Sequence, residues 1–323
     1  MNIAIIGTGW IAEKMAEAVN GLDDNYTAYA VGSRTAEKAE AFAEKWGFEK
    51  AYGSYEEMLK DDGIDLVYIA TPHSHHYENA KMCIEAGRNM LVEKAFTANA
   101  AQAEEIIRLA REKGLLITEA IWTRYMPSRR IIDEIIKSGI IGTPHMVYAD
   151  LCYPMSHKER IIKPELAGGA LLDIGVYTLN FASMVLGDDI EALSGQCTKF
   201  PSGTDSQNSV SVTYKNGSIA NLCSSALTPG SRNGTVFCSD GYLIAENINN
   251  PEVIRVFSTE HELIKEVYPP KQINGYEYQV IECREAIENG WTECPSMPHS
   301  ETVEIMKQMD TLRNLWGIRY PFE

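Results

Sequence analysis

The chain has 323 residues, of which 45% are hydrophobic and 23% are charged, and its formal net charge at pH 7 is −16. This length indicates two domains, and no apolar run approaches the roughly 20 residues that a membrane helix requires. The negative charge argues against nucleic acid as a partner, because phosphate backbones attract clustered basic side chains.

The N-terminal sequence and the spacing of the cysteines predict a soluble, cytoplasmic protein. The start, MNIAIIGTGW, has no basic stretch before its apolar run and no small-residue cleavage site, so it is typical of a first strand and not of a signal peptide. The seven cysteines are scattered and form no CxxC pair, which favours reduced thiols over disulfides or a zinc site.

The first third of the chain alternates between strand and helix patterns. Strands are predicted over residues 2–6, 28–31, 66–70, 89–92 and 115–119. Helices are predicted over residues 11–19, 77–85 and 100–113, with a further one between a capping Thr35 and Gly47. This alternation predicts an α/β Rossmann domain over residues 1–120 with a doubly wound parallel sheet.

The pattern changes after a helix over residues 128–137. β-rich runs follow near residues 146–153, 192–200, 209–214, 219–225, 235–239, 242–246, 253–258 and 263–268. Short polar turns such as KNG and SDG join several of them, which is typical of antiparallel hairpins. Helices are predicted over residues 169–186, 276–289 and 300–316. Residues 121–323 are therefore predicted to form an α+β domain whose mostly antiparallel sheet has helices on one face.

The turn after the first strand is a GxGxxA sequence that consists of Gly7, Thr8, Gly9, Trp10, Ile11 and Ala12. It follows a strand and opens a helix within a βαβ unit, which is the context of a dinucleotide-binding fingerprint. Gly7 allows the tight turn, Gly9 lets a pyrophosphate approach the backbone, and Ala12 permits close helix packing. The alternative is an ordinary tight turn between strand and helix.

The end of the second strand indicates which dinucleotide binds. An NAD-specific fold usually has an acidic residue there, whereas this chain has Gly32, Ser33 and Arg34. A guanidinium can bind a 2′-phosphate with two hydrogen bonds and Ser33 can donate another, so the cofactor is predicted to be NADP. The alternative is that Arg34 is a solvated surface residue.

Two further segments lie at carboxyl ends of predicted strands, where open α/β sheets bind ligands. The first contains Thr71, Pro72, His73 and His76, and the second contains Glu93 and Lys94. Both are predicted to contact the cofactor. No metal site is predicted, because adjacent histidines on a turn rarely aim at one ion and no nearby Cys or carboxylate completes a tetrahedral set. Lys94 is predicted to orient substrate or to tune a neighbour, and the alternative is a solvated loop lysine.

Asp173 and Tyr177 lie in the segment GGALLDIGVY and are four residues apart. On a helix both would project from one face and could converge on a single ligand, a geometry suited to proton transfer. Tyr177 could instead be a half-buried core tyrosine.

The combination of GxGxxA, TPHxxH, EKA and DxGxY, followed by an antiparallel domain, resembles the family of glucose–fructose oxidoreductase and inositol dehydrogenase. Within it, the segment EAIWTRYMP at residues 119–127 and GGALLDIGVY look like the dimeric dihydrodiol dehydrogenases and the NADP-dependent xylose dehydrogenases. The inositol-type members have histidine at the position of Tyr177. The family's EKP proline is Ala95 here, which removes a fixed φ angle beside Lys94.

The resemblance implies hydride transfer between nicotinamide and a secondary alcohol or carbonyl of an aldose or a cyclic vicinal diol. Tyr177 would exchange the hydroxyl proton, Lys94 would favour the phenolate and bind the substrate oxygen, and Asp173 would bind a second hydroxyl. Trp122 and Arg124 are implied as a substrate wall and as cofactor or substrate contacts. The resemblance implies that residues 121–323 serve in substrate binding and oligomerisation. Relatives commonly pair through the outer face of the C-terminal sheet, so a homodimer or a higher homo-oligomer is expected.

Two alternatives remain at this point. The same fold serves some relatives as a non-catalytic, cofactor-binding regulator of sugar metabolism, and the presence of both Lys94 and Tyr177 favours an enzyme over such a sensor. An NAD-dependent sugar or inositol dehydrogenase would differ in its cofactor, and Ser33 and Arg34 argue against it. The run Val210–Tyr214 alternates apolar and polar residues, which suits either a subunit contact or a helix-covered core.

Overall fold

The computed structural model describes residues 1–323, and residue contacts divide the chain into two compact units. The first unit consists of Met1–Tyr125 and Gln272–Val303, and the second of Met126–Lys271 and Glu304–Glu323. The first unit thus contains a late segment of the chain in addition to the predicted Rossmann domain. One bond that ties this segment in runs from the N–H of Ile117 to the carbonyl of Thr292, at 3.1 Å.

The first unit is built around a six-stranded, wholly parallel sheet with the strand order β3-β2-β1-β4-β5-β6. Its strands are β1 (Asn2–Ile6), β2 (Thr27–Gly32), β3 (Lys50–Tyr52), β4 (Leu66–Ile69), β5 (Asn89–Glu93) and β6 (Ile117–Ala120). The predicted doubly wound sheet is confirmed. The strand order reverses direction between β1 and β4, and such a point is where α/β sheets bind ligands. The three-residue β3 was not predicted because it is too short to show a pattern.

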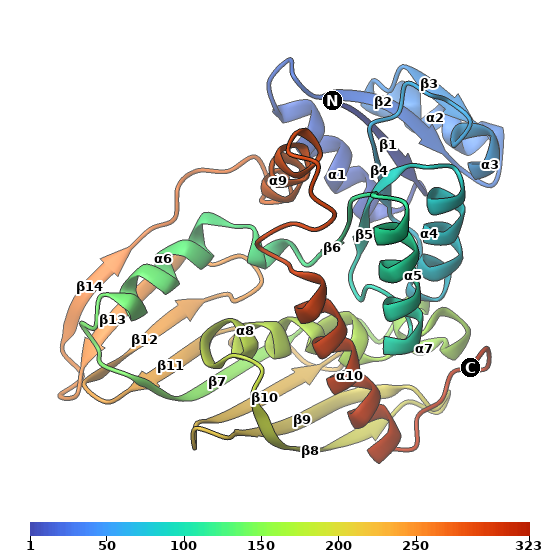
Figure 1. Cartoon of the computed structure of the whole chain (residues 1–323). Helices are drawn as coiled ribbons and strands as arrows, with labels where there is room; N and C mark the ends of the chain where they lie inside the picture. The colour runs from blue at the N-terminus through green and yellow to red at the C-terminus, as the bar shows by residue number, and fades with distance from the viewer. The chain divides into compact units, whose positions relative to one another are not determined.

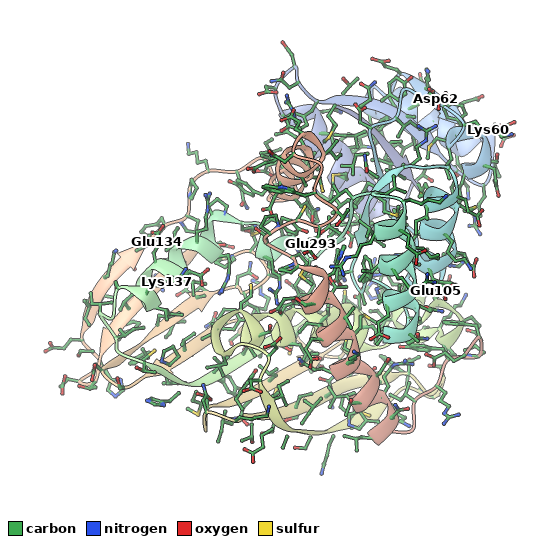
Figure 2. All side chains as sticks on the ribbon, in the orientation of Figure 1. Lys60, Asp62, Glu105, Glu134, Lys137 and Glu293 are labelled. Carbon is green, nitrogen blue, oxygen red and sulfur yellow. The ribbon has the colours of Figure 1, made fainter.

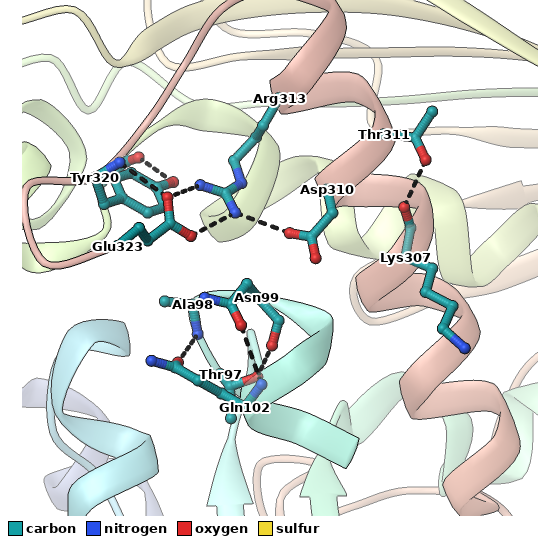
Figure 3. A network of polar contacts seen from close by, with 11 residues as sticks. Thr97, Ala98, Asn99, Gln102, Lys307, Asp310, Thr311, Arg313, Tyr320 and Glu323 are labelled. Carbon is teal, nitrogen blue, oxygen red and sulfur yellow. Dashed lines mark hydrogen bonds and ion pairs between the residues drawn. The ribbon is translucent and has the colours of Figure 1, made fainter. Parts of the chain in front are cut away.

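Helices cover both faces of this sheet, with α1 packed beside α2 and α9, and α4 beside α5 (Figure 1). They are α1 (Trp10–Gly21), α2 (Ala36–Trp46), α3 (Tyr55–Met58), α4 (His76–Glu85), α5 (Ala100–Glu112) and α9 (Glu277–Glu288), with 3₁₀ turns at η1 (His73–His75) and η2 (Trp122–Arg124). Gly47 ends α2 in the left-handed conformation as predicted, whereas Thr35 precedes α2 without a side-chain capping bond. Asn99 caps α5 by accepting the N–H of Gln102 at 3.0 Å (Figure 3).

The second unit contains an eight-stranded sheet with the order β14-β13-β12-β11-β7-β10-β9-β8. Its strands are β7 (Pro144–Cys152), β8 (Ile190–Lys199), β9 (Asp205–Tyr214), β10 (Ile219–Ser225), β11 (Gly234–Cys238), β12 (Gly241–Glu246), β13 (Val253–Ser258) and β14 (Leu263–Val267). Neighbouring strands are antiparallel except β7 and β10, which pair in parallel. The predicted mostly antiparallel sheet is therefore confirmed.

The helices of the second unit include one that packs over the middle of its sheet, where α8 contacts β7 and β10 (Figure 1). The helical segments are α6 (Pro127–Lys137), α7 (Glu159–Ile162), η3 (Pro164–Leu166), η4 (Leu171–Gly175) and α8 (Val176–Leu186), and the chain ends with α10 (His299–Leu315), which begins in the first unit. In α6, Ile132 and Ile135 are buried while Glu134 and Lys137 are exposed (Figure 2). This alternation is what a helix covering a sheet requires.

The segment Pro164–Leu186 is long and apolar enough to cross a membrane by length and composition alone. No apolar run of this length was expected from the sequence, because glycines and polar residues interrupt the segment. In the structure 83% of its most apolar window is buried inside the protein, as is typical of a core helix. It was predicted as one helix from residue 169, and its first part, η4, is instead a π-helical turn.

The two faces of the second sheet differ in what covers them. Val210, Val212 and Tyr214 are buried, so their alternation belongs to the helix-covered core and not to a subunit contact. On the opposite face Met146 and Tyr148 of β7 are 37% and 46% exposed, and Ile219 of β10 is 39% exposed. Apolar side chains thus lie on the face that no helix covers.

The loop after β5 carries Lys94, and two buried side chains hold it. The His76 imidazole lies with Nδ1 2.9 Å from the carbonyl of Ala95 and Nε2 2.7 Å from the carbonyl of Thr71. Glu119 of β6 accepts the N–H of Phe96 through Oε1 at 3.1 Å. Through these bonds, His76 of α4 and Glu119 of β6 fix the backbone on the carboxyl side of Lys94. The Lys94–Ala95 peptide bond in this loop is cis.

Both side chains are buried, and burial changes their protonation. Burial lowers the pKa of His76 to about 4, so the ring is neutral at pH 7 and donates to only one of the two carbonyls. Burial raises the pKa of Glu119 to about 7, although Arg124, the N–H of Phe96 and Thr302 oppose this shift. Because the folded state holds the Glu119 proton more tightly than the unfolded state does, raising the pH from about 5 to 8 lowers the free energy of unfolding.

We predict that Glu119→Gln removes this pH dependence. The amide keeps an oxygen for the N–H of Phe96 and carries no charge, so at pH 8 the variant gains of order 1–3 kcal/mol relative to the unmodified protein, and at pH 5 it gains little. Urea unfolding at both pH values measures the difference. Glu44→Gln, at an exposed position of α2, is the matched control and should be neutral at both. An equal effect of Glu119→Gln at pH 5 and pH 8 would contradict the prediction.

Candidate cofactor and substrate sites

The turn between β1 and α1 has the geometry of an anion-binding site. Gly7 has φ +107°, and a Cβ there would lie 3.0 Å from the carbonyl oxygen of Ala70. A Cβ on Gly9 would meet no atom within 4 Å, and no side chain caps α1. The first N–H groups of α1 therefore face open space, where the helix dipole favours a phosphate. This turn fits the pyrophosphate of a nicotinamide cofactor.

The other fingerprint residues surround this turn. Thr8 and Ile11 are half-buried and Trp10 is exposed. Ala12 is fully buried, which allows α1 to pack closely on the sheet. Thr8, Trp10 and Ile11 thus lie at the helix N-terminus, as the motif requires of residues that border a bound dinucleotide.

The end of β2 presents a cation without a neighbouring carboxylate in the sequence. Ser33 is buried and donates its backbone N–H to the carbonyl of Tyr52 at 3.1 Å, while Arg34 is exposed. Burial lowers the pKa of His75, and the positive charge of Arg34 lowers it further. The same charge partly opposes the burial that raises the pKa of Tyr55. The Arg34 guanidinium is therefore near enough to the His75 and Tyr55 side chains for its charge to affect the pKa of each.

The segment after β4 contains both exposed and buried residues. Pro72 is exposed and Thr71 is half-buried, with its Oγ1 accepting from Nδ2 of Asn79 at 2.9 Å. The rings of His73 and His76 meet edge to face at 5.8 Å. His76 is fully buried and joins the loops after β4 and β5 through its two ring nitrogens. The cofactor contact predicted for His76 from sequence stays a prediction.

Glu93 and Lys94 occupy the carboxyl end of β5. Glu93 is buried and accepts a hydrogen bond from the hydroxyl of Tyr68. Lys94 is half-buried, and its charge contributes to the lowered pKa of His76, after burial. The Lys94 ammonium group thus lies at the carboxyl end of β5, as the sequence position of Lys94 predicted.

Two residues from the late segment of the chain complete the area around η2. The ring of Tyr276 stacks on Trp122 with centroids 4.3 Å apart and an interplanar angle of 2°. Glu301 forms an ion pair with Arg124, whose Nη2 lies 2.7 Å from the Glu301 carboxylate. Sequence reasoning missed both partners, because more than 150 residues separate each pair and no local pattern reports such a contact. Arg124 is nearly buried in this pair, which makes it a structural anchor as well as a candidate contact.

Asp173 lies in the π-helical turn η4, and Tyr177 follows in the first turn of α8. Both are buried. Nη2 of Arg160 lies 3.0 Å from Oδ2 of Asp173, and the Arg160 side chain is 43% exposed. No motif pointed to Arg160. Its guanidinium can share Asp173 with a substrate hydroxyl, because a carboxylate accepts several hydrogen bonds. π-Helical turns are frequent at functional sites.

The predicted site residues divide between the two units. The fingerprint turn, Ser33, Arg34, the two loops after β4 and β5, Trp122 and Arg124 all belong to the first unit. Asp173 and Tyr177 belong to the second. The first unit is thus a candidate cofactor site, and η4 with α8 is a candidate site for proton transfer.

Comparison with known families agrees with this division. The profile of the oxidoreductase family with an NAD-binding Rossmann fold matches residues 1–120, and the profile of the GFO/IDH/MocA C-terminal domain matches residues 130–244. Together they match more than half of the chain. The first match coincides with the fingerprint turn and the parallel sheet.

Two relatives are similar over nearly the whole chain. A D-xylose 1-dehydrogenase (NADP(+)) of Hypocrea jecorina is 31% identical, over 98% of this chain and 92% of that protein. A trans-1,2-dihydrobenzene-1,2-diol dehydrogenase of Mus musculus is 30% identical, over 98% of this chain and 97% of that protein.

Solved structures share the fold. KijD10, a 3-ketoreductase from Actinomadura kijaniata in complex with NADP, matches with a TM-score of 0.86 and 24% identity, over 97% of each chain. A levoglucosan dehydrogenase in complex with NADH matches with a TM-score of 0.87 and 16% identity, over 98% of this chain and 97% of that one. With its fingerprint turn, its two sheets and these relatives, the chain belongs to the GFO/IDH/MocA family of NAD(P)-binding oxidoreductases.

Proposed function

We propose that the protein is an NADP-dependent dehydrogenase that acts on a secondary alcohol, or the corresponding carbonyl, of an aldose or a cyclic vicinal diol. The observation that carries the proposal is the presence of both Lys94 and Tyr177 in a chain that is about 30% identical, over nearly its full length, to sugar and diol dehydrogenases. A cofactor sensor has no need of a proton donor.

In the proposed reaction Tyr177 exchanges the proton of the substrate hydroxyl. The cofactor supplies the hydride acceptor for oxidation and the hydride donor for reduction. An unperturbed phenol is a poor base near neutrality, so we assign Lys94 the role of favouring the phenolate and binding the substrate oxygen. Asp173, oriented by Arg160, accepts a hydrogen bond from a second substrate hydroxyl. The ion pair between Arg160 and the buried Asp173 supports this role, because it orients the Asp173 carboxylate through Oδ2.

We propose Ser33 and Arg34 as the residues that bind the 2′-phosphate of NADP. Arg34 is exposed and lies at the end of β2 in a stretch, Gly32–Ala36, that contains no carboxylate. We propose that Thr71, Pro72, His73, Glu93, Trp122 and Arg124 border the cofactor. We also propose that residues 121–323 serve in substrate binding and oligomerisation, and the similarity to sugar and diol dehydrogenases supports this.

We further propose a homodimer or a higher homo-oligomer in the cytoplasm. The exposed apolar residues on the uncovered face of the second sheet, Met146, Tyr148 and Ile219, support self-association. All seven cysteines are free thiols, which suits a reducing compartment.

The cofactor assignment predicts that Arg34→Ala weakens NADP(H) binding about tenfold or more and leaves NAD(H) binding nearly unchanged. Loss of hydrogen bonds from a guanidinium to a phosphate is worth roughly 1.5–3 kcal/mol. Calorimetric titration of both cofactors measures the difference, with Arg108→Ala on the exposed side of α5 as the control. Equal affinity of the unmodified protein for NADP and NAD would overturn the assignment.

The chemical assignment predicts that Tyr177→Phe lowers kcat by roughly 10²-fold or more while cofactor affinity persists, because the ring remains and the transferable proton does not. Lys94→Met should lower kcat as well. Tyr268→Phe, at an exposed position just after β14, is the matched control. A Phe variant at position 177 with unchanged turnover would assign this tyrosine to packing and favour the sensor function.

The substrate assignment is tested by comparing kcat/KM for D-xylose, a cyclic trans-diol, cyclohexanol and lactate with NADP. A substrate without the hydroxyl that pairs with Asp173 forms one charge-assisted hydrogen bond fewer at a buried carboxylate, which should lower kcat/KM far more than removal of a methylene. We expect the sugar or the diol to be the best substrate. Faster turnover of cyclohexanol or lactate would show that both the diol assignment and the role of Asp173 are wrong.

A further inference from the structure

The turn that leads into Asp173 and Tyr177 is pressed against β9. Gly169 has φ +128°, and a Cβ there would lie 2.2 Å from Oδ1 of Asp205, the first residue of β9. A Cβ on the neighbouring Gly168 would lie 2.6 Å from the carbonyl oxygen of Ile161. The two glycines are therefore needed for the backbone to approach both neighbours, and one of these neighbours is a carboxylate.

Asp205 is buried and binds the first residue of η4. Its Oδ2 accepts the backbone N–H of Leu171 at 2.8 Å and Nδ2 of Asn208 at 2.9 Å. Oδ1 of Asn208 in turn accepts the hydroxyl of Ser224 at 2.9 Å. The Leu171 N–H is one of the N-terminal donors that a helix leaves without an internal partner. A strand side chain thus caps the turn that carries Asp173.

The other side of the turn is held by the last residues of the chain. The hydroxyl of Tyr320 donates to the carbonyl of Gly168 at 2.9 Å. The guanidinium of Arg313 lies 4.5 Å from the centre of the Tyr320 ring. It also binds the Glu323 carboxylate at 2.8 and 2.9 Å and Oδ1 of Asp310 at 2.8 Å (Figure 3). Gly168 is therefore fixed by Tyr320, and Leu171 by Asp205.

The burial of Asp205 carries a cost. Burial raises its pKa to about 6, although Asn208, the N–H of Leu171 and Arg313 oppose the shift. A buried carboxylate is a poor way to add stability alone, since a well-packed apolar group serves equally well or better. Its distinguishing property is directional: it fixes one N–H group two residues before Asp173 and six before Tyr177.

We propose that Asp205 is a positioning residue, which holds Leu171 so that Asp173 and Tyr177 point in their working directions. Nothing in this role requires Asp205 to touch substrate or cofactor. The proposal rests on the proposed function for Tyr177, and it extends the reaction machinery to a residue on β9. Asn208 supports this role, because the Asn208 amide donates a hydrogen bond that orients the Asp205 carboxylate.

The test compares removal of the acceptor oxygen with its conservation in the full chain. Asp205→Ala removes the oxygen that accepts the N–H of Leu171, and kcat should fall about 10-fold. In Asp205→Asn the amide oxygen takes the place of Oδ2 and accepts from both Leu171 and Asn208, so kcat should stay within about threefold of the unmodified enzyme. The dissociation constant of NADPH, measured by fluorescence, should stay within about threefold in both variants, since the cofactor residues belong to the first unit.

Val236→Ala in β11 is the matched control for a purely structural effect. It removes buried methyl groups from the same sheet and should lower the thermal midpoint without a comparable loss of kcat. An unchanged kcat in Asp205→Ala would overturn the proposal. So would an equal loss of kcat in Asp205→Asn, or a loss in Asp205→Ala no larger than that of Val236→Ala.

A measurement without substrate separates this proposal from the proposed function. Amide hydrogen exchange of peptides that cover residues 168–177 should be faster in Asp205→Ala and close to normal in Asp205→Asn. If Tyr177→Phe leaves turnover unchanged, the proposed function fails, while this exchange result still decides whether Asp205 holds the turn. Identical exchange in all three proteins would overturn the positioning role.

Discussion

The site-bearing turns of both units depend on buried carboxylates that accept backbone N–H groups. In the first unit Glu119 binds the N–H of Phe96, two residues after Lys94. In the second unit Asp205 binds the N–H of Leu171, two residues before Asp173. Burial raises the pKa of both acids, to about 7 and about 6. Each unit therefore uses a costly buried acid to define the backbone beside a residue proposed to act in the reaction.

The arrangement in the second unit explains why the turn before Asp173 contains glycine. A carboxylate that caps a turn from a neighbouring strand must approach the backbone closely. At Gly169 the approach leaves no room for a Cβ. On the cofactor side, Gly7 is equally constrained by the carbonyl of Ala70, whereas Gly9 opens toward the space that a phosphate would fill. The glycines of the two motifs thus serve different needs: close packing in the protein at Gly7 and Gly169, and ligand approach at Gly9.

Local charge differs from the overall charge of the chain. The net charge of −16 disfavours polyanions as partners, yet the turn at α1 and Arg34 offer an anion a helix N-terminus and a guanidinium. A dinucleotide requires only such local groups. Arg160 likewise places a cation on the buried Asp173. The charge of the whole chain therefore says little about either site, because screening confines these interactions to neighbouring groups.

The sequence by itself determined the features that depend on local periodicity and local backbone demands. The parallel sheet followed from apolar runs between helical patterns, and the fingerprint turn followed from glycines at a strand–helix junction. The left-handed end of α2 followed from Gly47. These signals are local because neighbouring residues along the chain produce them.

Only the tertiary structure decided which distant groups meet. It brought Tyr276 onto Trp122, Glu301 to Arg124 and Asp205 to Leu171. It also placed Val210–Tyr214 in the core and turned the start of the predicted helix at 169–186 into a π-helical turn. These outcomes depend on packing between elements that lie tens to hundreds of residues apart. No periodicity in a single sequence records them, because each partner satisfies its local pattern equally well without the other.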